Sequence, residues 1–118
     1  MATAGSIAVG LLALLHLYIL VLEMFLWDKP PGLRAFGLAP DFARATKAMA
    51  ANQGLYNGFL AAGLIWGLYL GPDGGAVRTF FSVCVLIAGL FGGLTANRKI
   101  LWVQAAPAAI TLVLLALG

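Results

Sequence analysis

A run of 22 nearly uninterrupted apolar residues, 6–27, constrains this chain more than any other feature. A helix of that length crosses the roughly 30 Å of hydrocarbon in a lipid bilayer. Residues 1–5 carry no charged side chain, and the run itself contains His16 and Glu23, which is unlike a cleaved signal peptide. We therefore expect a retained membrane-spanning helix.

The composition favours the same class of protein. Of the 118 residues, 63% are hydrophobic and 9% charged, whereas soluble proteins carry about 25% charged residues. The net charge of +3 is too small and scattered for the basic stripe that nucleic-acid binding needs. The single cysteine, Cys84, excludes an internal disulfide, and its apolar neighbours predict a small buried side chain. We expect one transmembrane domain, 1–118, with membrane lipids and no nucleic acid as partners.

Glycines, prolines and charges divide the chain into four expected helices, at about 6–27, 42–70, 76–96 and 100–117. This pattern predicts an all-α fold, an integral membrane four-helix bundle with up-down-up-down topology.

Three connections separate these helices. DKPPGLRAFGLAP, at 28–40, holds three prolines and predicts a non-helical connection, with Asp41 as the N-cap of the next helix. GPDGG and ANRK supply the two tight turns. Pro107 lacks an amide hydrogen and predicts a kink in the last helix.

The positive-inside rule gives the expected orientation. Six cations flank the first and third connections, and Arg78 alone flanks the second; the six are Lys29, Arg34, Arg44, Lys47, Arg98 and Lys99. We expect a multi-pass protein of the bacterial inner (cytoplasmic) membrane, with these two connections cytoplasmic and both termini outside.

Polar side chains interrupt the second helix in the stretch AMAANQGLYNGFLAA, 48–62. They are spaced by four residues, which predicts one polar face about two turns long, formed by Asn52, Gln53, Tyr56 and Asn57. A small-residue flank for close helix packing follows the same spacing, at Gly54, Gly58 and Ala62.

The expected topology puts a polar group from every helix in the cytoplasmic half of the bilayer. Glu23, the second-helix face, Thr95 and Asn97 at the end of the third helix, and Gln104 lie there, with His16 as a floor. Arg98, beside Asn97, is the candidate ligand for an anion. This distribution predicts a shared polar pocket.

His16 and Glu23 are seven residues apart and share one side of the first helix. In one interpretation Glu23 is a catalytic acid/base or cation-binding group, and His16 relays a proton. In the other, Lys47 or Arg98 neutralises Glu23, and His16 bonds a second-helix amide to lock the bundle.

The remaining candidates also have two interpretations. Tyr56 is a candidate catalytic proton donor, or a buried hydroxyl satisfied by a carbonyl. Asn52, Gln53, Asn57, Arg98 and Gln104 are candidate ligand-binding residues, although amides also join membrane helices and cations also set orientation. One histidine and one nearby glutamate do not make a ligand set, so we predict no metal site.

Four segments carry a family resemblance: LLHLYILVLEMFLW at 14–27, NQGLYNGFLAAGL at 52–64, AGLFGGLT at 88–95 and VQAAPA at 103–108. Together they resemble the small bacterial membrane family catalogued as domain of unknown function 1304. The resemblance covers nearly the whole chain and implies the four-helix architecture.

A more distant resemblance is to the membrane-associated eicosanoid and glutathione metabolism (MAPEG) family, whose members are four-helix trimers that bind glutathione between subunits. Arg44, Ala48, Asn52 and Asn57 look like part of the pattern on that family's second helix. Leu55 stands where that family has an acidic residue, and the third helix lacks its Arg and Tyr pair. The resemblance implies a homo-oligomer, a trimer first of all, and glutathione as a candidate cofactor.

The sequence leads to one main hypothesis, a small membrane protein that binds a small polar or amphiphilic ligand in a pocket of the cytoplasmic leaflet. A MAPEG-like membrane enzyme is one form of it. A proton-coupled transporter of small solutes and a structural membrane subunit remain as alternatives.

Overall fold

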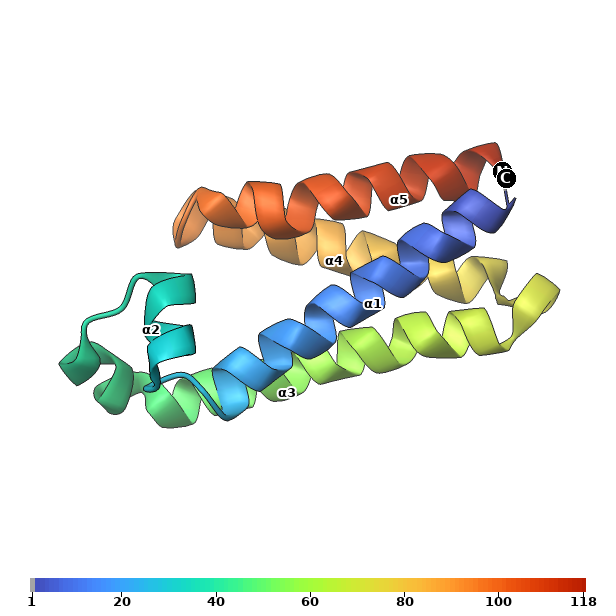
Figure 1. Ribbon diagram of the computed structural model, residues 1–118. Helices are drawn as coiled ribbons and strands as arrows, with labels where there is room; N and C mark the ends of the chain where they lie inside the picture. The colour runs from blue at the N-terminus through green and yellow to red at the C-terminus, as the bar shows by residue number, and fades with distance from the viewer. Residues whose placement is uncertain (1) are drawn as a thin grey trace. The chain divides into compact units, whose positions relative to one another are not determined.

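The computed structural model describes residues 2–118, and in these residues the chain is helical without a β-strand (Figure 1). The long helices are α1 (Ala2–Met24), α3 (Pro40–Tyr69), α4 (Gly75–Thr95) and α5 (Ala106–Leu117), the last preceded by a π-helical turn, η2 (Leu101–Ala105). Shorter elements are α2 (Pro30–Phe36) and a 3-10 turn, η1 (Gly71–Gly74). The all-α prediction is confirmed, and each predicted long helix is present.

The chain forms two compact parts. The central part comprises residues 14–59, and the terminal part comprises residues 2–13 and 60–118. Helices α1 and α3 each contribute one segment to each part.

The first connection was predicted to be non-helical, and this is wrong because it contains α2. Pro30 and Pro31 occupy the first turn of α2, where backbone N–H groups have no intrahelical partner and proline loses nothing. Gly37 ends the helix in the left-handed conformation, with φ 64°, and its N–H donates to the Leu33 carbonyl. The same residue types that break a helix in its interior therefore begin and end one here.

The predicted N-cap at Asp41 is also wrong, because α3 already begins at Pro40. Asp41 lies in the first turn, where its carboxylate is favourable beside the exposed N–H groups of the helix. It forms an ion pair with Arg44, three residues further on.

Small residues of α3 let α1 approach closely in the central part. A Cβ atom at Gly54 would lie 2.6 Å from Met24 Cγ, and one at Gly58 would lie 2.7 Å from Leu20 Cδ1. The predicted packing flank is confirmed at both glycines. It does not extend to Ala62, which is exposed, while the adjacent Ala61 is fully buried.

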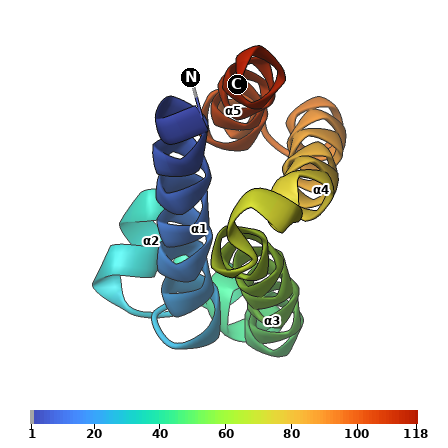
Figure 2. The same cartoon turned by 90° about the vertical axis from the view of Figure 1, so that its right-hand side faces the viewer.

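In the terminal part α4 lies beside η2 and α5 (Figures 1 and 2). Gly89 makes this possible, since a Cβ atom there would lie 2.5 Å from the Ala105 backbone nitrogen. The disturbance expected at Pro107 takes the form of the π turn just before it, where the Ala106 N–H donates to the Leu101 carbonyl.

Two helical stretches, Thr3–Met24 and Gly71–Thr95, are long and apolar enough to cross a membrane by length and composition. The final helix, Leu101–Leu117, is apolar but shorter. Helix α3 has sufficient length, but the polar residues of its first two thirds lower its mean hydropathy.

Candidate functional site

The buried acidic residue of the central part is Glu23, in the last turn of α1. Its exposed fraction is 5%, although the helix ends one residue later at Met24. Burial of a carboxyl group is costly unless a polar partner satisfies it. The chemistry of the site therefore depends on which group forms a hydrogen bond with the Glu23 carboxyl.

Asn57 of α3 is the partner. Its side-chain Nδ2 donates a hydrogen bond of 2.5 Å to Glu23 Oε1, and Asn57 is itself only 8% exposed. Gly54, one turn earlier, has room for the first carbon of Glu23, because a Cβ atom at Gly54 would lie 3.0 Å from Glu23 Cβ. The expected contact between Glu23 and the second-helix amides is confirmed, with Asn57 as the amide that makes it.

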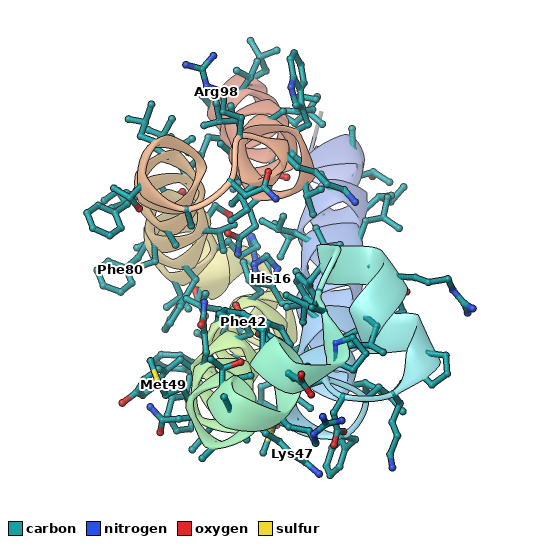
Figure 3. All side chains as sticks on the ribbon, turned by 90° about the vertical axis from the view of Figure 1, so that its left-hand side faces the viewer. His16, Phe42, Lys47, Met49, Phe80 and Arg98 are labelled. Atoms are coloured by element: carbon teal, nitrogen blue, oxygen red, sulfur yellow. The ribbon has the colours of Figure 1, made fainter. Side chains whose placement is uncertain are left out.

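His16 lies on the same side of α1 as Glu23. It is fully buried, and Figure 3 shows its position on α1. At 100° per residue, a spacing of seven residues leaves an offset of only about 20° around the helix. Its side chain thus has little access to solvent, and any proton that it exchanges passes through groups that surround it.

The four polar residues of α3 do not form the single face predicted for them. Asn57 is buried, whereas Asn52, Gln53 and Tyr56 are exposed, Tyr56 by 57%. At 100° per residue, Asn52 and Tyr56 share one side of the helix, and Asn57 lies about 100° or more away from them. The outward side that carries Asn52 and Tyr56 is called the α3 outer face below, with Gln53 at its edge.

Lys47 does not neutralise Glu23, as one interpretation supposed. Its Nζ lies 3.2 Å from Asp28 Oδ2, in the segment between α1 and α2. The hydrogen-bonded Lys47 ammonium lowers the pKa of the Asp28 carboxyl below its ordinary value. Sequence reasoning missed this pair, whose only signal was the opposite charge of the two residues.

Aromatic contacts hold the same end of the central part together. The Trp27 Nε1 donates a hydrogen bond of 3.0 Å to the Thr46 hydroxyl. The Trp27 ring also contacts Phe36 of α2, with 4.9 Å between ring centroids. An amphipathic ring with a satisfied N–H, such as that of Trp27, is typical of a membrane edge.

Arg98 and Gln104 belong to the terminal part. Arg98 is exposed in the turn after α4, where the neighbouring Lys99 N–H donates to Asn97 Oδ1. Gln104 is half-buried in η2, and its Cβ lies where Gly89 leaves space. The roles proposed for both residues stay predictions.

Residues 2–118 bring together no group of three or more His, Cys, Asp or Glu side chains that could hold a metal ion. The buried polar side chains of the central part are a carboxyl group, an amide and a histidine. These groups can bind polar atoms, and the carboxyl and imidazole can also exchange protons.

In residues 2–118 the protein is all-helical, with two helices apolar enough to span a membrane. A buried carboxyl–amide pair joins α1 to α3. The chain belongs to the family described as "Protein of unknown function (DUF1304)", whose model matches residues 10–116. It is similar to the "Uncharacterized protein YpaA" of Lactococcus lactis subsp. lactis, with 28% identity over 105 residues, which cover 87% of this chain and 88% of that protein. No solved structure matches the chain.

Proposed function

We propose that this protein is a multi-pass protein of the bacterial inner membrane, in which all four long helical stretches cross the bilayer. Large apolar side chains on every long helix support this, because they are exposed without a covering partner; examples are Leu11 at 62%, Phe59 at 56%, Phe91 at 70% and Val113 at 57%. Soluble monomers rarely expose apolar surface on this scale.

The proposed orientation places the segments before α3 and after α4 in the cytoplasm. Single cysteines at two exposed positions, Lys29→Cys and Asp73→Cys, test it in a Cys84→Ala background. A membrane-impermeant maleimide should label position 73 in intact cells and position 29 only after permeabilisation. Labelling of position 29 from outside would refute the orientation.

We also propose that the protein binds a small polar or amphiphilic ligand at the α3 outer face, where copies of the chain meet in a homo-oligomer. The observation that carries this proposal is the setting of Asn52 and Tyr56. Both are exposed, while Met49 and Phe59 on the same helix are 75% and 56% exposed.

Polar amides and hydroxyls in contact with hydrocarbon need a partner, since an unsatisfied polar group there costs several kcal/mol. A neighbouring subunit together with a ligand supplies such partners. A trimer is the assembly to expect by resemblance to the MAPEG family, and glutathione is the first polar ligand to test.

The test compares matched tyrosine variants of the purified full chain. Tyr56→Phe removes one hydroxyl from the α3 outer face, and Tyr18→Phe removes one from an equally exposed position on α1, at 59%. Native mass spectrometry in mild detergent should show an oligomer with retained or added ligand. Tyr56→Phe should weaken binding of the ligand by the oligomer by about tenfold, the equivalent of 1.4 kcal/mol. Tyr18→Phe should leave this binding unchanged.

A monomer across all protein concentrations, or equal effects of the two variants, would refute the proposal. Glutathione is added as one of the ligands. An oligomer that does not bind glutathione would support the proposed assembly and exclude glutathione as its ligand.

A proton-coupled transporter is the second candidate, and a specific observation favours it. His16 and Glu23 are both buried on one side of α1, an arrangement suited to proton relay. In proteoliposomes, a transporter would move protons with a solute, and Glu23→Gln would abolish this movement while leaving the fold intact. Absence of both transport and ligand binding would instead favour the structural subunit.

A further inference from the structure

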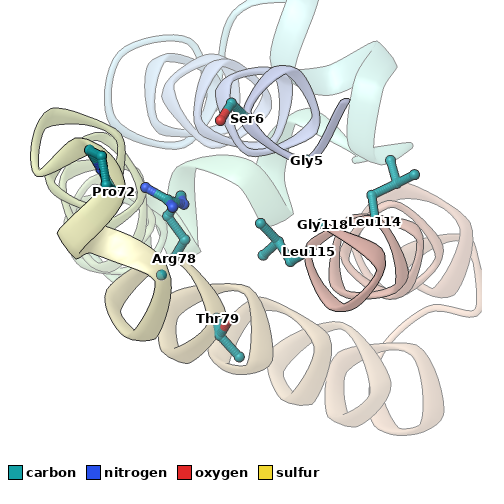
Figure 4. Close-up of a pocket in the computed structure, with 9 residues that line it drawn as sticks. Gly5, Ser6, Pro72, Arg78, Thr79, Leu114, Leu115 and Gly118 are labelled. Carbon is teal, nitrogen blue, oxygen red and sulfur yellow. The ribbon is translucent and has the colours of Figure 1, made fainter. Parts of the chain in front are cut away.

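The terminal part contains a cavity with a volume of about 400 Å³. This is within the size range of small-molecule sites in proteins, about 300–1,000 Å³. It opens between the start of α1, η1, the start of α4 and the end of α5, and its lining includes Ser6, Pro72, Arg78, Thr79, Leu114 and Leu115 (Figure 4).

Arg78 gives this cavity a fixed positive charge. Its Nη1 donates hydrogen bonds of 2.7 Å to the Gly67 carbonyl and 2.8 Å to the Gly71 carbonyl. The Gly67 carbonyl lies in the last turn of α3, where the helix itself leaves carbonyls without donors, and Gly71 is the first residue of η1. The guanidinium is thereby held in place with donors to spare, because the group has five N–H bonds.

Two buried polar atoms on α4 have no hydrogen-bond partner in residues 2–118. One is Arg78 Nε, and the other is the Ser82 hydroxyl, one helical turn further along α4 and fully buried. Positions four residues apart lie on the same side of a helix. Of these two residues, Arg78 lines the cavity and Ser82 does not.

The wall of the cavity combines two kinds of surface. Ser6 and Thr79 contribute hydroxyl-bearing residues to the lining, and the leucines Leu114 and Leu115 of α5 contribute apolar ones. The only acidic side chain of η1, Asp73, is exposed and does not line the cavity.

We propose that this cavity binds an anionic amphiphile, with its phosphate or carboxylate group on Arg78 and its apolar tail against Leu114 and Leu115. Arginine suits this role because its planar fork matches phosphate and carboxylate oxygens in a bidentate geometry. The hydroxyls of Ser6 and Thr79 donate to the remaining oxygens. The inference is independent of the ligand proposed at the α3 outer face.

The experiment measures binding to the purified full chain by calorimetry in a non-ionic detergent. The probes are dihexanoyl phosphatidic acid, dihexanoyl phosphatidylcholine and inorganic phosphate. We expect saturable binding of phosphatidic acid with one molecule per chain, and much weaker binding of phosphatidylcholine, whose ammonium group compensates the phosphate charge. Competition by inorganic phosphate at similar concentrations would instead identify a soluble anion as the ligand of the same site.

Two variants and two matched controls decide where the probe binds. Arg78→Gln should weaken binding by tenfold or more, about the value of one charge-assisted hydrogen bond. Gly75→Leu should also weaken it, because Gly75 lines the cavity in a helical conformation and a Cβ atom there meets nothing within 4 Å. The controls Ala76→Leu and Arg34→Gln change exposed residues that do not line the cavity and should leave binding unchanged.

Gly75→Leu keeps the test valid if Arg78→Gln fails to fold, since Arg78 also caps α3. Binding of no probe would overturn the proposal. So would phosphatidic acid binding that survives Gly75→Leu or falls equally with Ala76→Leu.

Discussion

Replacing Glu23 by leucine should destabilise the protein through Asn57. The leucine has nearly the volume of glutamate and suits an apolar site, so burial of the new side chain is favourable. Asn57, however, is 92% buried and loses the acceptor of its 2.5 Å hydrogen bond. A buried donor left without a partner costs about 1–3 kcal/mol, and this is the expected loss in the free energy of unfolding.

Three further variants separate the hydrogen bond from the packing. Glu23→Gln retains an acceptor oxygen for Asn57 Nδ2 and should cost less than about 1 kcal/mol. Asn57→Leu should cost about 1–3 kcal/mol, because it strands the carboxyl group. The double variant with leucine at both positions should be more stable than the sum of the single losses predicts, by at least about 1 kcal/mol of coupling.

The assay is reversible unfolding in mixed micelles, with dodecyl sulfate as denaturant and far-ultraviolet circular dichroism as the signal. Equal losses for Glu23→Gln and Glu23→Leu would refute the reasoning, because the acceptor would then be irrelevant. Additive losses in the double variant would refute it as well.

The remaining predictions concern backbone packing and acid stability. Gly89→Ala should lower the free energy of unfolding by about 1–3 kcal/mol, since its Cβ would lie 2.5 Å from the Ala105 backbone nitrogen. Gly75→Ala should raise it by about 0.5–1 kcal/mol, because Gly75 has a helical φ of −56° and open space around it. Thermal unfolding measures both variants, and equal effects would contradict the close packing at Gly89. The lowered pKa of Asp28 means that its pair with Lys47 stabilises the fold above about pH 4, the ordinary aspartate value, and that this contribution is lost as the pH falls through the lower folded-state pKa. Wild type should therefore lose stability relative to Asp28→Asn between about pH 5 and pH 2, and parallel pH profiles would show that the pair contributes nothing.

Local sequence patterns were sufficient for the existence of the helices but not for every boundary. Long apolar runs separated by glycine, proline and charge leave few alternatives to helices of about the observed lengths. Helix α2 was missed because Pro30 and Pro31 are read as breakers unless their position in a first turn is known. Whether Pro30 and Pro31 fall in a first turn depends on where α1 ends, and no local sequence pattern predicts that residue.

For the candidate site, the sequence by itself determined which residues share a side of each helix, since the helical period requires it. The seven-residue spacing puts His16 and Glu23 together, and depth along neighbouring helices brings Glu23 to the level of the α3 amides. Only tertiary packing decided which amide meets the carboxyl. Gly54 and Gly58 let α1 approach one side of α3, so Asn57 turns inward to Glu23 while Asn52 and Tyr56 are left exposed. The partner of Lys47 and the anchoring of Arg78 by two carbonyls were likewise decided in three dimensions, because such pairs depend on chain reversals and helix ends that the helical period does not describe.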